Sequence, residues 1–190
     1  MAKLPGTRAT GLTSDNIDFF WKDDNFPAIN LSFGASPPDT IAYNGTGIGI
    51  IAFDGAATSE EVYGGLEYNH DAFYGVGAVI KAHVHWCPVD TNAGNVKWNL
   101  EYNISNTGDV GTSTTVSVVS AAGGVAWATV RASFPDVSIS DHNIGAQIGF
   151  RLYRDPMDAE DTYGSDAAIK FTIGFHYLVS SPGSRLVGTK

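Results

Sequence analysis

The chain has 190 residues, of which 43% are hydrophobic, 12% aromatic and 16% charged. This composition excludes intrinsic disorder, and the length suits one domain rather than two. Eleven Lys and Arg residues against 20 Asp and Glu give a net charge of −9, which excludes a basic surface for nucleic acid or an anionic membrane. The longest apolar runs fall far short of the ~20 residues of a membrane span, and the first residues lack the apolar core of a secretion signal. We therefore expect a soluble protein that binds neither nucleic acid nor membrane.

The residue types favour β-structure along the whole chain. Val and Ile together number 28 against 10 for Leu and Met, and 22 glycines provide for many tight turns. Eight strand-like runs, separated by turn sequences, predict strands at 47–53, 62–68, 76–86, 96–104, 113–119, 125–134, 144–153 and 168–179. Strands of this number and spacing predict an all-β fold, an antiparallel β-sandwich of jelly-roll type with about eight strands.

The two ends differ in composition from the middle of the chain. We expect residues 1–20 to form an N-terminal arm, residues 21–180 the sandwich and residues 181–190 a C-terminal tail. The arm is polar until an aromatic cluster begins, which comprises Ile17, Phe19, Phe20 and Trp21. Two interpretations stay open: the arm is flexible, or it docks on a neighbouring subunit through this cluster.

Alternation of apolar and polar residues predicts a hairpin between residues 81–86 and 96–102. Pairing Trp86 with Trp98 brings the two apolar faces together, and a slip of one residue would destroy that match. The same register pairs the polar side chains of the two strands, His85 with Asn99 and His83 with Glu101. The last predicted strand carries His176 on its polar face in the same way.

The histidine-bearing face has three interpretations: a metal site, a polar network inside a subunit interface, or solvated surface. Gly77, five residues and then His83-Val84-His85 resemble the opening of the cupin metal motif, but its Glu and its whole second part are absent. We expect no metal and no cofactor, with His83, His85, Glu101 and His176 as the candidate ligands if one binds. The interface candidates are Ile17, Phe19, Phe20, Trp21, His83, His85, Asn99 and Glu101.

No catalytic signature is present. A nucleophile elbow, a P-loop and a dinucleotide fingerprint are all missing, so we expect a protein that is not an enzyme. The acidic residues between 155 and 166 are interpreted as a solvated loop that pairs weakly with Arg151 and Arg154. Carbohydrate recognition by exposed aromatics, namely Tyr68, Phe73 and Tyr74, is a further alternative.

Several short blocks of the sequence together resemble a known group of proteins. In order and spacing they are similar to small structural proteins of tailed bacteriophages and prophages, over roughly residues 21–185. The blocks are WKDDNFP at 21–27, residues 49–54, HVHW at 83–86, GNVKWNLEY at 94–102, Phe134-Pro135, RLYRD at 151–155, DTYG at 161–164, Asp166-Ala167 and FHY at 175–177.

This resemblance implies a non-enzymatic virion protein with a jelly-roll sandwich, most simply a capsid decoration or head-fibre-type protein. Such a protein would self-associate as a homotrimer and attach to other virion proteins of the capsid or tail. It would be made in the host bacterial cytoplasm, which fits the single cysteine, Cys87. The alternatives are a tail-associated structural protein and a cupin-like metal-binding enzyme that uses His83 and His85.

Overall fold

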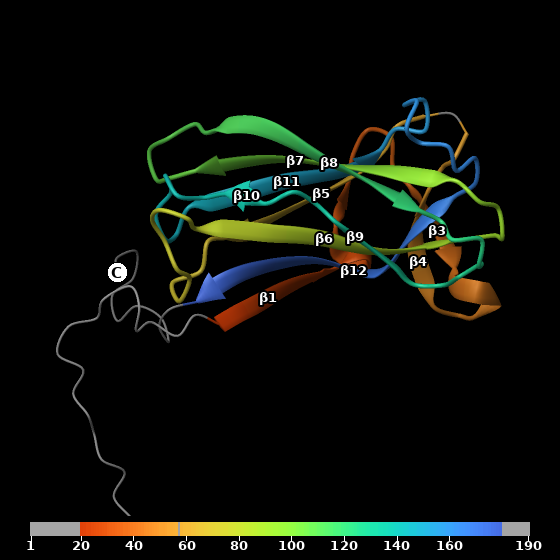
Figure 1. Ribbon diagram of the computed structural model, residues 1–190, viewed down its shortest axis with the longest axis horizontal. Helices are drawn as coiled ribbons and strands as arrows, with labels where there is room; N and C mark the ends of the chain where they lie inside the picture. The colour runs from red at the N-terminus through yellow and green to blue at the C-terminus, as the bar shows by residue number, and fades with distance from the viewer. Residues whose placement is uncertain (1–19, 57, 180–190) are drawn as a thin grey trace, which may run out of the picture.

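The computed structural model describes residues 20–56 and 58–179, which form two antiparallel β-sheets packed face to face (Figure 1). The protein is thus an all-β sandwich of jelly-roll type, as its composition predicts. The expectations for Ile17, Phe19 and the C-terminal tail lie outside the described residues. Within those residues the helices are the short 3₁₀ turns η2 (Ala28–Asn30) and η3 (Tyr43–Gly45), and neither is long and apolar enough to cross a membrane.

The first sheet, called sheet A, has seven strands in the order β10-β6-β12-β4-β3. Strand β9 also pairs with β6, and β1 also pairs with β12, next to the short β12–β4 ladder. Their bounds are β1 Phe20–Pro27, β3 Asp39–Ala42, β4 Gly49–Phe53, β6 Val79–Pro88, β9 Val130–Ser133, β10 Val137–Ser138 and β12 Ala167–Val179.

The second sheet, called sheet B, has five strands in the order β2-β5-β11-β7-β8. Their bounds are β2 Ser32–Phe33, β5 Glu60–Glu67, β7 Asn95–Ser105, β8 Thr112–Ala121 and β11 Gln147–Arg154. Sheets A and B bury their inner faces against each other in one large apolar core. Four strands were not predicted from the sequence, namely β1, β2, β3 and β10. Each is short or mostly exposed, so its residues show no clear hydrophobic alternation from which a strand could be predicted.

The predicted hairpin between the strands of Trp86 and Trp98 is wrong. Strand β6 belongs to sheet A and β7 to sheet B, so the two tryptophans meet across the core, with ring centroids 6.1 Å apart. Alternation requires only that both apolar faces be buried. Two strands that face each other from opposite sheets bury their apolar faces as well as two strands paired within one sheet do. The polar faces of the two strands consequently point to opposite sides of the molecule.

Two aromatic residues with positive φ disturb the regular pattern of predicted strands. Trp127, at φ 63°, lies in a turn, so the predicted strand 125–134 is reduced to β9. Phe171, at φ 80°, lies where the register between β12 and β6 shifts, and this irregularity turns its ring out of the core to 42% exposure. Both rings pack edge-on against Tyr43 instead.

The acidic segment after β11 is not wholly solvated, which corrects the sequence interpretation. Arg154 is fully buried, and its guanidinium donates to both carboxylate oxygens of Asp161 at 2.8 and 2.9 Å. Its remaining hydrogen bonds go to the carbonyls of Phe53, Tyr163 and Ser165. The pair therefore holds the loop after β11 against the end of β4.

Candidate functional site

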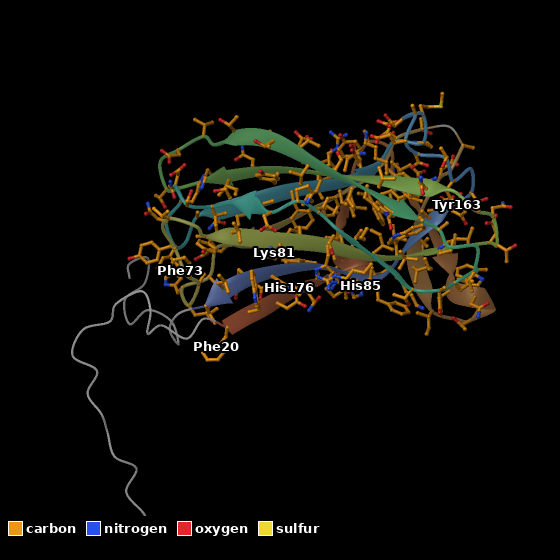
Figure 2. All side chains as sticks on the ribbon, in the orientation of Figure 1. Phe20, Phe73, Lys81, His85, Tyr163 and His176 are labelled. Carbon is orange, nitrogen blue, oxygen red and sulfur yellow. The ribbon has the colours of Figure 1, made fainter. Side chains whose placement is uncertain are left out.

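A cluster of titratable side chains lies on the outer face of sheet A, where β1, β12 and β6 run side by side. We call Asp23, His83, His85 and His176 the histidine cluster. The β1–β12 register places Asp23 opposite His176, and the β12–β6 register places Gly174 opposite His83. Figure 2 labels His85 and His176 in the lower part of the view, beside β12 and β1. Three strands that are distant in sequence thus build the cluster: β1 and β12 contribute one residue each, and β6 contributes two.

The side chains of the histidine cluster are in mutual contact. The ring of His83 lies between the other two histidines, with centroids 4.7 Å from His176 and 4.9 Å from His85. The Nε2 atom of His176 lies 3.3 Å from Asp23 Oδ1. One possible ligand atom from each of Asp23, His83 and His176 lies within 4.8 Å of the other two.

His83 is the buried centre of this cluster, with only 4% of its surface exposed. Its ring occupies space that exists only because the opposite residue is Gly174. A Cβ at position 174 would lie 2.3 Å from His83 Cε1. Burial, aided by the positive charge of Arg131, lowers the pKa of His83 to about 4. The imidazole is therefore neutral at pH 7, yet its buried Nδ1 has no hydrogen-bond partner.

Replacing Gly174 with alanine is expected to lower the free energy of unfolding by about 1–3 kcal/mol, because the new methyl group displaces the packed His83 ring. The matched control is Gly149→Ala on β11, where nothing lies within 4 Å of the added Cβ. This control should change stability by less than about 0.5 kcal/mol. Urea denaturation of both variants measures the difference, and equal effects would contradict the contact between His83 and β12.

Two of the residues expected on this face are elsewhere. Asn99 and Glu101 lie on β7 in sheet B, where Asn99 accepts a hydrogen bond from Ser117 and Glu101 pairs with Arg151 at 3.1 Å. The expected pairs of His85 with Asn99 and His83 with Glu101 therefore do not form, and Glu101 cannot complete a ligand set with His83 and His85. Exposed Phe20 and Trp21 begin the neighbouring strand β1.

Asp23 is the member of the cluster that the sequence interpretation missed. It lies in the charged run of the block at residues 21–27, which has no strand-like alternation. Only the pairing of β1 with β12 brings Asp23 beside His176. In the sequence, the feature that draws attention to Asp23 is its place in the resemblance block at residues 21–27.

The outer face of sheet B carries a shallow groove of about 390 Å³. Its walls include Tyr63, Glu101 and Arg151, while Gly149 leaves its floor open. The Arg151 guanidinium is already engaged, since it pairs with Glu61 at 2.8 Å and lies 4.2 Å from the centroid of the Tyr153 ring. The aromatics expected for carbohydrate recognition are not here.

Those aromatics lie in and near the loop before β6, and they differ in burial. Tyr68 is 2% exposed and its hydroxyl donates to the Phe73 carbonyl, so the expectation that Tyr68 is a surface aromatic is wrong. Tyr74 is 44% exposed. A buried tyrosine cannot stack on a sugar, so Tyr68 cannot contribute to a sugar-binding surface.

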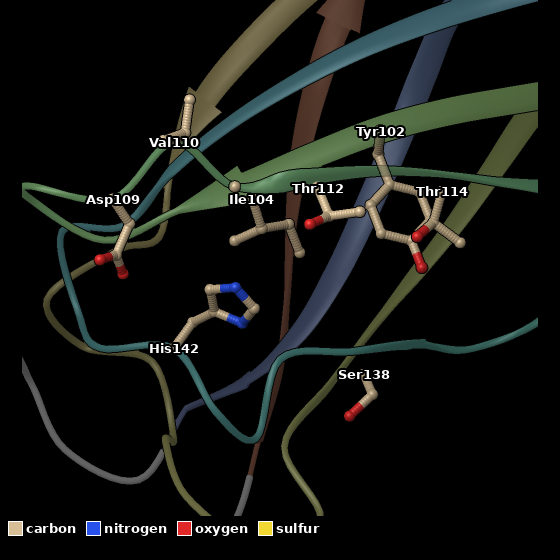
Figure 3. A pocket seen from close by; sticks show the side chains of 9 residues that line it. Tyr102, Ile104, Asp109, Val110, Thr112, Thr114, Ser138 and His142 are labelled. Carbon is tan, nitrogen blue, oxygen red and sulfur yellow. The ribbon is translucent and has the colours of Figure 1, made fainter.

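A larger pocket, of about 480 Å³, opens at one end of the sandwich between the β7–β8 turn and the segment around β10 (Figure 3). Asp109, Ser138 and His142 lie among its walls. The Ser138 hydroxyl lies 3.1 Å from Ser140 Oγ. Among the described residues no hydrogen bond joins Ser138 to His142, whose Nδ1 is buried without a partner.

No protein-family model and no curated protein matches the chain. Among solved structures, it is similar to the CBM36-1 domain of a multidomain xylanase from the hindgut metagenome of Trinervitermes trinervoides. That match has 14% identity and a TM-score of 0.45, and covers 81% of this chain and 96% of the other.

Two further carbohydrate-binding modules are similar at the same level. A CBM36 module in complex with calcium and xylotriose has 13% identity and a TM-score of 0.43, covering 81% of this chain and 98% of that one. TmCBM61 in complex with β-1,4-galactotriose has 16% identity and a TM-score of 0.40, covering 85% and 88%. Similarity of this degree concerns architecture and carries no inference about ligands.

Proposed function

We propose that this protein is a non-enzymatic structural component of a tailed-phage virion. Its role would be that of a capsid decoration or head-fibre-type protein, which self-associates as a trimer and attaches to the particle. A tail position for the same module is the alternative. The observation that carries the proposal is that the sequence blocks that resemble phage structural proteins supply the buried framework of the fold.

The blocks contribute the largest side chains of the core. Trp86 comes from the block at 83–86 and Trp98 from the block at 94–102, and both are fully buried. The blocks at 151–155 and 161–164 supply the buried Arg154–Asp161 pair. Residues that hold a sandwich together indicate a shared fold, on which the function is carried by the surface. This supports a common scaffold with phage structural proteins.

Strand β1 offers the surface for self-association. It pairs with β12 on one side, and among the described residues no strand pairs with its other side. Its first two residues are large and exposed, Phe20 at 64% and Trp21 at 49%. An unpaired edge with exposed aromatics favours contact with another chain, and closed symmetric homo-oligomers are the commonest assemblies. The proposed occupant of this edge is a second copy of the chain.

The double variant Phe20→Ser with Trp21→Ser is expected to convert the trimer into monomers, because the exposed aromatics supply the apolar contact area of the edge. Size-exclusion chromatography with light scattering at micromolar concentration measures the mass. Phe33→Ser, at 47% exposure on β2 of sheet B, is the matched control and should leave the trimer intact. A monomeric wild-type protein would refute self-association.

The virion assignment has its own test. An antibody raised against the purified protein should label intact particles of the parent phage in electron micrographs, at regularly spaced positions on the head. Labelling restricted to the tail would select the tail alternative. Particles purified to constant composition that lack the protein by mass spectrometry would refute the assignment altogether.

A further inference from the structure

We propose that Asp23, His83 and His176 bind one divalent transition-metal ion, and that the ion ties strand β1 to β12 and β6. The three residues come from three adjacent strands of sheet A, so a single ion would cross-link two ladders. This inference is independent of the virion assignment, because it rests on the histidine cluster alone.

The positions of the three side chains suit a common ion. Ligand atoms about 2.1 Å from a tetrahedral ion lie roughly 3.4 Å from one another. His176 Nε2 and Asp23 Oδ1 are already 3.3 Å apart, and the His83 ligand atom lies within 4.8 Å of both. Asp23 is exposed on an edge strand, and its carboxylate contacts Asn25 Nδ2 at 2.9 Å and His176 Nε2 at 3.3 Å. Bringing the three atoms to the spacing around an ion requires a small movement of the side chains.

His83 supplies the second, independent sign of a ligand. A buried polar atom normally has a hydrogen-bond partner, and Nδ1 of His83 has none. Coordination through Nδ1 would satisfy this group.

The donor set indicates the class of metal. Two imidazole nitrogens and one carboxylate oxygen suit zinc and other first-row divalent ions, whereas calcium and magnesium prefer oxygen alone. Three protein ligands leave a fourth position for water or for His85, whose ring lies 4.9 Å from that of His83. The site thus has the ligand number of an open zinc centre.

The surrounding charges limit the affinity. Asp23 is the one carboxylate of the cluster, and Arg131 on β9 lies opposite His85 in the β6–β9 ladder. Lys81 is paired with Asp136 at 2.7 Å, which offsets its charge. An ion here would leave a local positive excess, so we expect binding weaker than that of thiolate-rich structural zinc sites.

Isothermal titration of the EDTA-treated full chain with ZnCl₂ at pH 7.5 should give one ion per chain. The variants Asp23→Asn, His83→Ala and His176→Ala should each weaken binding by about tenfold or more. The matched controls are His142→Ala and His70→Ala, two histidines outside the cluster, and they should bind zinc as the wild type does. Circular dichroism spectra verify that each variant is folded, and Asp23→Asn, exposed on β1, tests the site even if His83→Ala is unstable.

Hydrogen exchange gives a readout of the cross-link itself. Zinc should slow amide exchange along residues 20–27 in the wild type and have no such effect in Asp23→Asn, because the ion ties β1 to its neighbours. Retention of full affinity by any one of the three ligand variants would overturn the three-ligand site. The same conclusion would follow from absent binding at ~100 µM zinc, far above the dissociation constants of zinc sites in proteins, or from loss of binding in the His142→Ala control.

Discussion

Asp161→Ala is expected to lower the free energy of unfolding by about 3–5 kcal/mol, because it leaves the guanidinium of Arg154 buried without a counter-charge. The exposed fraction of both side chains is at most 1%. Asp161 also accepts a hydrogen bond from the Lys97 amide at 3.1 Å, so its removal frees a second donor. A loss of this size is a large share of the stability of a typical domain.

Arg151→Ala is the matched control for that prediction. Arg151 lies on the same strand, three residues earlier, and pairs with Glu61 and Glu101 while remaining 32% exposed. Water screens such a pair, so its loss should cost about 1 kcal/mol or less. Urea denaturation of both variants measures the two values. Similar costs for Asp161→Ala and Arg151→Ala would show that the first pair is not desolvated.

Trp98→Ala is expected to cost about 3–5 kcal/mol as well, since it opens a cavity at the centre of the core. The indole is fully buried and packs edge-on against Phe53, with ring centroids 5.2 Å apart, and against Trp86 from the other sheet. The variant therefore weakens the contact between the sheets rather than one ladder. Thermal and urea unfolding measure the loss, and a cost below about 1 kcal/mol would contradict a central position.

Two phenylalanine variants separate packing from hydrogen bonding. Trp86 Nε1 donates to Ser120 Oγ at 3.0 Å, whereas Trp98 Nε1 is buried without a partner. Trp86→Phe leaves the Ser120 hydroxyl unsatisfied, while Trp98→Phe removes an unsatisfied donor. Trp86→Phe should therefore be the more destabilising of the two, by about 1–2 kcal/mol. The reverse order would contradict the different environments of the two indoles.

The fold class could be predicted because it depends on local chemistry. Branched residues and frequent glycine turns favour strands wherever they occur, and most of the long strands lie within a few residues of their predicted ranges. The missed strand β1 shows the limit of that reasoning. Its charged residues have no alternation, and it is a strand because β12 offers a partner along eight residues.

The candidate site was predicted in part. His83, His85 and His176 share one face, as the alternation of β6 and β12 indicates. Glu101 was placed with them on the assumption that consecutive strands pair, and it lies on the far sheet instead. Asp23 replaces it, from a strand some 60 residues earlier in the chain than His83.

Residue alternation therefore indicated which side chains of most long strands face the apolar core, since that property follows from period two and from hydrophobicity alone. It left open which strands are neighbours, because an apolar face is buried equally well beside a partner in the same sheet or across the core. Long-range pairing and sheet stacking settle that choice. They place Trp86 against Trp98 between the sheets and bring Asp23 to His83 and His176 on one surface.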